Sequence, residues 1–276
     1  MTDFDASLPL GRTTEYKSEY DAGLLCAVPR SLKRLELGLE RALPFQGVDI
    51  WNAFELSWLQ PGGKPVVAMG EFRFPCHSPN IVESKSFKLY LNSFNQTRFA
   101  DFAEVEQVLA EDLGRVAGAP VQVRLIGSER FGEERLFALP GRCIDGIDIA
   151  VSQYQLEAEL LAGAADAEDV VEEELHSHLL KSNCLVTWQP DWASVLVRYR
   201  GGRIDPAALL RYLISFRQHN EFHEQCVERI FADLMRFCRP ERLTVYARYT
   251  RRGGLDINPF RSNFENTVEN LRLARQ

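Results

Sequence analysis

The chain has 276 residues, of which 45% are hydrophobic and 26% charged, an ordinary globular composition that excludes a disordered or fibrous protein. Its formal net charge of −7 argues against a basic nucleic-acid-binding domain, so we expect no direct binding to nucleic acid. No apolar run reaches the roughly eighteen residues of a membrane span, and the first residues carry no secretory signal, so a cytoplasmic protein without membrane contact is expected.

The first half is predicted to open with a hairpin. Residues 53–58 and 65–74 are apolar, aromatic-rich runs, and the turn-forming Pro61-Gly62-Gly63 separates them. Residues 84–96 and 101–116 then place apolar side chains at helical spacing. Alternating apolar and polar residues at 121–125 predict a strand with one buried face.

The second half is predicted to repeat this order. The expected elements are strands at 185–188 and 193–199 around a Pro190-Asp191 turn, helices at 206–218 and 222–237, and a strand at 243–250. Between the halves, residues 157–174 are rich in Ala, Asp and Glu, which favours a solvated connecting helix or linker.

A sequence pattern that occurs in both halves supports a duplication. Residues 90–96 and 212–218 share the pattern Y-L-x-S-F-x-Q, and the segments Trp58–Pro61 and Trp188–Pro190 precede the two copies. We therefore predict an α+β fold of two tandem ββααββ modules, with antiparallel sheets and helices packed on one face. The predicted divisions are a module at 1–150, an acidic connecting segment at 151–180 and a module at 181–276.

Several common motifs are absent. The chain has no G-x-G-x-x-G, no G-x-x-x-x-G-K-[ST] and no G-x-S-x-G. His219 and His223 have i, i+4 spacing, and His176 and His178 bracket one residue, but neither pair shows a third ligand with its own supporting contacts. We therefore predict hydrogen-bonded histidines and no metal site.

Six cysteines lie at positions 26, 76, 143, 184, 226 and 238, with no C-x-x-C pair. We expect free thiols, most of them buried as small hydrophobic side chains. Cys184 differs because it follows Lys181-Ser182-Asn183, a loop-like, partly exposed setting in which a thiolate can form. Asp191 lies across the expected turn, so the two form a nucleophile and proton donor suited to addition across a polar multiple bond. A buried structural cysteine is the alternative.

These motifs also resemble a known family. S-N-C-x-V-T-x-Q-P-D-W at 182–192, E-S-K-S-F-K-L-Y at 83–90 and F-H-E at 222–224 are similar to the NADPH-dependent 7-cyano-7-deazaguanine reductases, the nitrile reductases of queuosine biosynthesis, in their long two-module form. The resemblance extends to residues 9–13, 51–55 and 251–254. Leu185 departs from it, since many relatives carry Pro after the cysteine, and we expect no chemical consequence.

The resemblance implies a tunnelling fold, a homodimer, and ligands bound at module interfaces. It also implies two NADPH consumed per turnover and a thioimide formed by Cys184, with Asp191 protonating the nitrile nitrogen. Partial burial is expected to raise the pKa of Asp191 so that it holds this proton.

The remaining roles are implied by the same motifs. The 7-deazaguanine substrate is expected to contact Glu83, Ser84, Lys85, His223 and Glu224, and NADPH is expected to contact Lys85, Ser86, Arg252 and Gly253. Carboxylates suit the donor-rich edge of a guanine-like ring, and a forked Arg suits phosphate.

Two alternatives remain open. The first is a metal-dependent pterin or purine cyclohydrolase on the same fold, which predicts stoichiometric zinc. The absence of a ligand pair near Cys184 argues against it. A tRNA-binding module predicts steeply salt-dependent binding, against which stands the acidic net charge.

Overall fold

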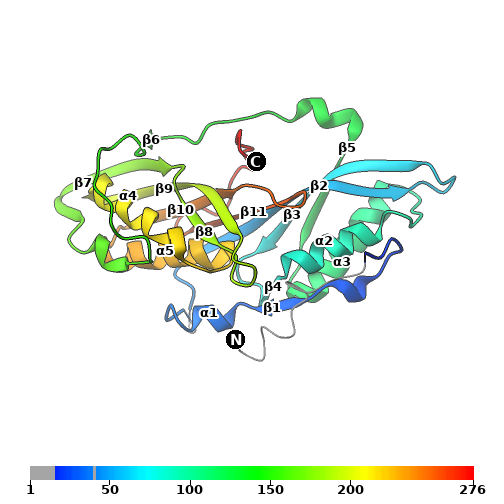
Figure 1. The fold of residues 1–276 in the computed structure, drawn as a ribbon, viewed down its shortest axis with the longest axis horizontal. Helices are drawn as coiled ribbons and strands as arrows, with labels where there is room; N and C mark the ends of the chain where they lie inside the picture. The colour runs from blue at the N-terminus through cyan, green and yellow to red at the C-terminus, as the bar shows by residue number, and fades with distance from the viewer. Residues whose placement is uncertain (1–15, 40–41) are drawn as a thin grey trace. The chain divides into compact units, whose positions relative to one another are not determined.

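The structure is a computed structural model that describes residues 16–39 and 42–276; the motif at residues 9–13 lies outside them. The chain divides into two compact units. Unit 1 comprises the described residues of Met1–Lys33, Asp49–Arg135 and Arg251–Asp256, and unit 2 those of Arg34–Val48, Leu136–Thr250 and Ile257–Gln276. Mixed helices and mainly antiparallel strands confirm the α+β class (Figure 1).

Unit 1 contains the predicted hairpin, helix pair and strand. Strand β2 (Gln46–Leu59), which begins in unit 2, neighbours β3 (Pro65–Pro75), and β3 pairs antiparallel with β5 (Gln122–Gly127). A separate two-stranded sheet joins β1 (Ala27–Pro29) to β4 (Asn80–Val82). The helical elements are η2 (Ala22–Leu24), α1 (Ser31–Arg34, ending in unit 2), α2 (Ser84–Ser93), α3 (Phe102–Ala117) and η3 (Ser128–Glu133).

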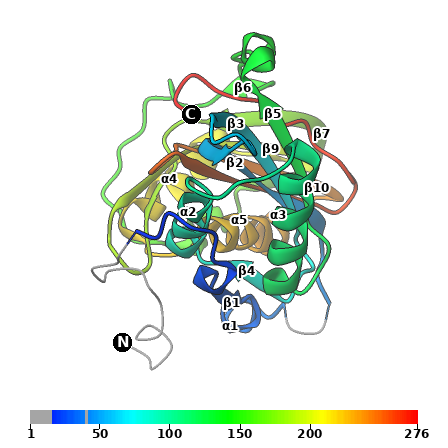
Figure 2. The same ribbon diagram turned by 90° about the vertical axis from the view of Figure 1, so that its right-hand side faces the viewer.

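Helices α2 and α3 lie beside the strands of unit 1 (Figure 2). Aromatic side chains fasten the two helices to these strands. The ring of Phe87 on α2 lies 5.4 Å from Trp51 of β2 and 5.1 Å from Phe72 of β3. Phe102 on α3 lies 4.9 Å from Trp58 of β2. Such edge-to-face pairs add to the free energy gained by burying the rings.

Unit 2 has a sheet in the order β11-β10-β9-β7-β6. Its strands are β6 (Arg142–Cys143), β7 (Ala165–Ser177), β9 (Pro190–Ile204), β10 (Arg242–Tyr249) and β11 (Leu255–Ser262, beginning in unit 1), with β8 (Lys181–Asn183) paired to the start of β9. The pairing is antiparallel except for that of β6 with β7. The helical elements are η4 (Ala158–Leu161), α4 (Pro206–Ser215), η5 (Phe216–Gln218) and α5 (His223–Phe237), and α5 packs on β10.

The expected helix or linker at residues 157–174 is wrong, because β7 occupies most of it. The acidic residues of β7 lie opposite basic residues of β9: Glu174 is paired with Arg198 and Glu172 with Arg200. Arg198 Nε donates to Glu174 at 2.5 Å. Opposite charges across a strand pair stabilise the sheet, so cross-strand contact overrides the helical composition.

The expected strand at residues 185–188 is also wrong. Those residues form the turn between β8 and β9, whereas the predicted turn at Pro190-Asp191 belongs to β9. Trp188 has a φ of 61° and is 71% exposed. The apolar run that suggested a strand therefore forms a tight turn, in which Leu185 and Val186 are half-buried and Trp188 is exposed.

The repeated Y-L-x-S-F-x-Q pattern corresponds to a repeated geometry. Tyr90 on α2 donates its hydroxyl to Asp112 on α3 at 2.7 Å, and Tyr212 on α4 donates to Asp233 on α5 at the same distance. The Trp echo does not correspond, since Trp58 is buried in β2 and Trp188 is exposed. After its helices, unit 2 has two strands, β10 and β11, whereas unit 1 has β5 and then η3.

In the part of the chain that the structure describes, no helix combines the length and apolarity that a membrane span requires.

Candidate active site

Cys184 lies directly after β8 at the start of the turn to β9. Its backbone N–H donates to the carbonyl of Gln189 at 2.9 Å, and its carbonyl accepts from the N–H of Trp188 at 3.1 Å. The side chain is only 6% exposed, and Ser182 and Asn183 before it are buried strand residues. The expected position at a strand start after a partly exposed loop is therefore wrong, although the thiol is free.

The strand register brings Asp191 to the same face as Cys184. Ser182 pairs with Asp191 and Asn183 with Pro190, and the N–H of Cys184 bonds to Gln189. Cys184 and Asp191 are thus diagonal neighbours across the ladder, a relation that places Cβ atoms about 7–8 Å apart or somewhat less. This spacing leaves room for a small linear group between the thiol and the carboxyl.

His223 faces Asp191 from the first residue of α5. Its Nε2 lies 3.3 Å from Oδ1 of Asp191, and its ring stacks on that of Tyr249, with centroids 3.7 Å apart and planes 3° from parallel. His223 Nδ1 is buried without a hydrogen-bond partner among the described residues. Buried polar atoms are usually hydrogen-bonded, so this nitrogen is available to a ligand or a water molecule.

Glu224 follows in the first turn of α5 and is 2% exposed. A carboxylate in the first turn of a helix is stabilised by the unpaired backbone N–H groups and the helix dipole. Unit 2 therefore supplies Cys184, Asp191, His223 and Glu224. Each of them is buried and lies at or near the end of a helix or strand.

A second cysteine, Cys226, lies close to Asp191 and Tyr249. Cys226 of α5 is fully buried beside the hydroxyls of Ser182 and Tyr249, and burial raises its pKa well above the usual range. Burial, and then the neighbouring Cys226 and Asp191, likewise raise the pKa of Tyr249. Cys226 therefore stays protonated and serves packing, as expected for a cysteine on an apolar helix.

The histidines at i, i+4 spacing have separate partners. Nε2 of His219 lies 3.0 Å from Glu221, which also accepts from Arg229 at 2.7 Å, whereas His223 faces Asp191. Burial alone would raise the pKa of Glu221, but the hydrogen bonds from His219 and Arg229 outweigh it and the pKa is lowered.

Glu83, in unit 1, is the N-cap of α2 and is 1% exposed. Its two carboxylate oxygens accept the N–H groups of Lys85 and Ser86 at 2.8 and 2.7 Å. Burial raises its pKa, and the two N–H groups lower it by less. Glu83 is itself buried, whereas Ser84 and Lys85, the first two residues of α2, are half-buried.

The turn Arg251–Gly254 also belongs to unit 1. Gly253 and Gly254 have φ values of 56° and 68°, a region that side chains other than glycine rarely adopt. A Cβ at Gly253 would lie 3.3 Å from the side chain of Lys88. Lys88 of α2 is thus a cation beside Arg252-Gly253, and the sequence motifs alone did not point to it. Its spacing could have done so, because Lys88 lies one helical turn after Ser84 and Lys85 and therefore on the same face of the helix.

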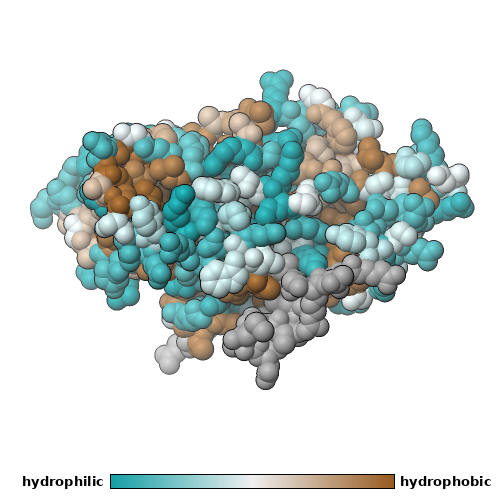
Figure 3. Space-filling model, viewed as in Figure 1, coloured by the Kyte–Doolittle hydropathy of each residue, from teal (hydrophilic) through white to brown (hydrophobic). Residues whose placement is uncertain are grey.

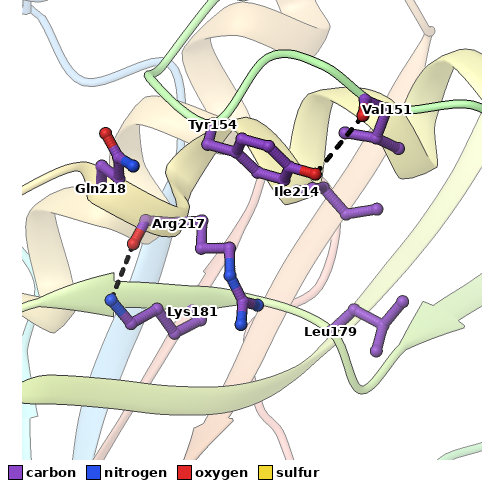
Figure 4. Close-up of a pocket in the computed structure, with 7 residues that line it drawn as sticks. All are labelled: Val151, Tyr154, Leu179, Lys181, Ile214, Arg217 and Gln218. Carbon is purple, nitrogen blue, oxygen red and sulfur yellow. Dashed lines mark hydrogen bonds between the residues drawn. The ribbon is translucent and has the colours of Figure 1, made fainter.

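A pocket of about 670 Å³ lies elsewhere in unit 2 (Figure 4). Its lining combines two basic residues with apolar and polar ones: Val151, Tyr154, Leu179, Lys181, Ile214, Arg217 and Gln218. Lys181 donates to the carbonyl of Arg217 at 2.7 Å. Figure 3 shows apolar surface over α4. None of the predicted site residues lines this pocket.

Comparison with known families identifies two matching segments. Residues 16–125 match the model described as "Nitrile reductase, 7-cyano-7-deazaguanine-reductase N-term", and residues 190–267 match that of "QueF-like protein". The first match contains Glu83–Ser86, and the second contains Asp191, His223, Glu224 and Arg252-Gly253. Cys184 lies between them.

Proposed function

Because the chain belongs to the 7-cyano-7-deazaguanine reductase family, and is thus a nitrile reductase of queuosine biosynthesis, we propose that it acts through a covalent thioimide on Cys184. The reaction converts the nitrile of 7-cyano-7-deazaguanine to the aminomethyl group. The observation that supports the proposal most directly is the β8–β9 register, which sets a free thiol and a buried carboxyl on one face.

In the first step the sulfur of Cys184 adds to the nitrile carbon. One π bond of the nitrile breaks, its electron pair moves to nitrogen, and a proton reaches that nitrogen, which gives a thioimide. A thioimide is a better electrophile than a nitrile, so one difficult reduction is divided into easier steps.

Asp191 supplies the proton to the nitrogen. His223 at 3.3 Å is placed to exchange a proton with it. Tyr249 holds the imidazole of His223 in plane by stacking. After reduction of the thioimide carbon, the carbon–sulfur bond breaks and the thiolate leaves, and the resulting imine is reduced to the amine.

In unit 2, Glu224 is suited to the adjacent ring N–H and exocyclic NH₂ of the deazaguanine, and in unit 1 Glu83 offers the same carboxylate chemistry. Both carboxylates are almost fully buried, where charge-assisted hydrogen bonds discriminate strongly between ligands. Glu83 already accepts two backbone N–H groups, and each carboxylate oxygen retains a further lone pair. The further substrate contacts that we propose are Ser84 and Lys85 in unit 1 and, in unit 2, the unpaired Nδ1 of His223.

We propose that NADPH binds to residues of unit 1. Lys85, Lys88 and Arg252 are cations near the turn at Gly253, Ser86 lies buried in the first turn of α2, and a forked guanidinium is suited to a phosphate. When bound, the cofactor supplies the two hydrides of the four-electron reduction. The role of the chain is to hold its phosphates and to control proton delivery.

Mass spectrometry of the intact protein with the nitrile substrate and no NADPH tests the proposal. The wild-type chain is expected to gain the mass of one substrate, and Cys184→Ala is expected to show no adduct and no turnover. Cys143→Ser, which changes the exposed thiol, is the matched control and should form the adduct normally. An adduct that survives Cys184→Ala, or that disappears in Cys143→Ser, contradicts the assignment.

The family resemblance also leads us to propose a homodimer, for which light scattering during size-exclusion chromatography should give twice the mass of the chain.

A further inference from the structure

Three potential metal-ligand side chains meet in unit 2, and none of them has a role above. Sγ of Cys143 and one imidazole nitrogen each of His176 and His178 lie within 4.8 Å of one another. Among the residues that the structure describes, this is the one group of three or more such side chains so close together.

The sheet itself assembles this group. Cys143 on β6 is the register neighbour of His176 on β7, and the parallel pairing continues through the N–H of Ile144, which donates to the carbonyl of His176 at 3.0 Å. His176 and His178 are two residues apart on β7, so their side chains share a face. Their ring centroids are 5.2 Å apart.

Each histidine has a partner that orients its ring. Nδ1 of His176 lies 2.9 Å from the carbonyl oxygen of Pro140, and Nδ1 of His178 lies 2.7 Å from Oγ of Ser194. A carbonyl only accepts, so Nδ1 of His176 carries the proton and Nε2 keeps its lone pair. Such supporting contacts are typical of metal-binding histidines.

We propose that Cys143, His176 and His178 bind one Zn²⁺ ion. A thiolate with two imidazoles is a ligand set that zinc favours. In a tetrahedral site with Zn–N of about 2.0 Å and Zn–S of about 2.3 Å, ligand atoms lie about 3.3–3.6 Å apart. Side-chain rotations that bring the atoms about 1 Å closer complete the site. Cys143 and His178 are exposed, so water takes the fourth position.

The surrounding charges are balanced. Arg275 donates to the carbonyl of His178 at 3.0 Å and to Ser194 at 3.2 Å, which places a positive charge nearby. The carboxylate of Asp145 accepts from Ser177 Oγ at 2.5 Å and from the N–H of His178 at 2.9 Å, and offsets that charge.

The ion acts as a clamp on a short strand. β6 has two residues and, among the strands that the structure describes, it pairs with β7 alone. A metal bonded to Cys143 on one strand and to two histidines on the other fastens them together, and binding to the folded state alone raises its stability.

Zinc titration of the reduced, metal-free, full-length protein tests the proposal, with calorimetry and thermal unfolding as readouts. One equivalent is expected to bind and to raise the unfolding temperature. Cys143→Ser and His176→Gln should each weaken binding at least 10–100-fold, and Ser194→Ala about tenfold. Co²⁺ in place of Zn²⁺ should give a thiolate-to-metal charge-transfer band that Cys143→Ser removes.

His77→Ala and Cys26→Ser, which change a histidine and a cysteine in unit 1, are the matched controls and should bind zinc as the wild type does. Cys184→Ala should also retain the ion. The proposal would be overturned if zinc did not bind stoichiometrically, if binding survived the combination of Cys143→Ser with His176→Gln, or if it were lost in Cys184→Ala. None of these results bears on the thioimide.

Discussion

The proposed chemistry in unit 2 depends on single side chains that sit at element ends. Cys184 ends the β8 ladder, Asp191 lies near the start of β9, and His223 begins α5. The regular hydrogen bonds of these elements are made by the backbone, so they do not depend on the side chain at the end of the element. Small changes of these side chains should therefore alter the reaction without unfolding the chain.

Asp191→Asn tests the proton donor. The amide keeps the size and much of the polarity of the carboxyl but cannot deliver its proton, so we expect kcat to fall about 10²–10⁴-fold, the usual contribution of general acid–base catalysis. Steady-state NADPH consumption measures the loss. Affinity for the nitrile substrate, measured in the Cys184→Ala background, should change far less. Near-normal kcat in Asp191→Asn would assign the proton to another group.

Tyr249 is expected to position His223 through its ring and not its hydroxyl. Tyr249→Phe keeps the stack at 3.7 Å and should leave kcat within about threefold, whereas Tyr249→Leu frees the imidazole and should lower kcat about 10–100-fold. The pH profile of kcat should shift in Tyr249→Leu alone. Equal losses in both variants would show that the hydroxyl carries the effect.

At the scale of elements, α5 carries His223 and Glu224 and is anchored by a buried charge cluster. Glu228, one to two turns further along α5, accepts from Arg34 at 2.6 and 2.9 Å and from Arg261 at 2.9 and 3.1 Å. All three side chains are buried. A helix fixed in this way keeps its first turn in a constant position.

Glu228→Gln should strongly destabilise the fold. Removing one partner of a buried ion pair leaves uncompensated buried charge, here on two arginines, and costs about 3–5 kcal/mol of unfolding free energy. Urea unfolding followed by circular dichroism measures it. The control is Glu133→Gln, which breaks the exposed pair of Arg130 and Glu133 and should leave the midpoint unchanged. A loss no larger than the control's would mean that α5 is held by its apolar face alone.

At the scale of the molecule, the distribution of charge matters more than its sum. The net charge is −7, yet unit 1 gathers Lys85, Lys88 and Arg252 around α2 and the glycine turn. An acidic protein with a local basic cluster repels anions in general and attracts them at that one place.

The KM for NADPH should therefore depend on salt. Raising ionic strength from about 0.01 to 0.15 M shortens the screening length from about 30 to 8 Å, and we expect the KM for NADPH to rise roughly three- to tenfold. The rate of adduct formation with the uncharged nitrile should hardly change. Lys88→Ala should raise the KM for NADPH at low salt and flatten its salt dependence; an unchanged KM in this variant would remove Lys88 from the cofactor site.

Local patterns were sufficient for much of the fold. Apolar spacing placed α2, α3, α4 and α5 and the strands β3, β5 and β10, because each depends on contacts within a few residues or on one buried face. The repeated Tyr and Ser of the Y-L-x-S-F-x-Q pattern marked two helices with the same hydrogen bonds. The E-S-K-S and S-N-C motifs pointed to the family that the comparisons support.

Tertiary contacts decided the rest. The acidic composition of β7 favours a helix until the arginines of β9 lie opposite it, and no local pattern in residues 157–174 contains that partner. The burial of Cys184 and its diagonal relation to Asp191 follow from strand β8, which begins at Lys181, four residues before the strand predicted at 185–188. His176 and His178 lacked a third ligand in sequence, and Cys143 becomes their neighbour only when β6 pairs with β7. The contacts of β7 with β9 and of β6 with β7 join strands separated in sequence, and their free energy is gained only once the sheet has formed.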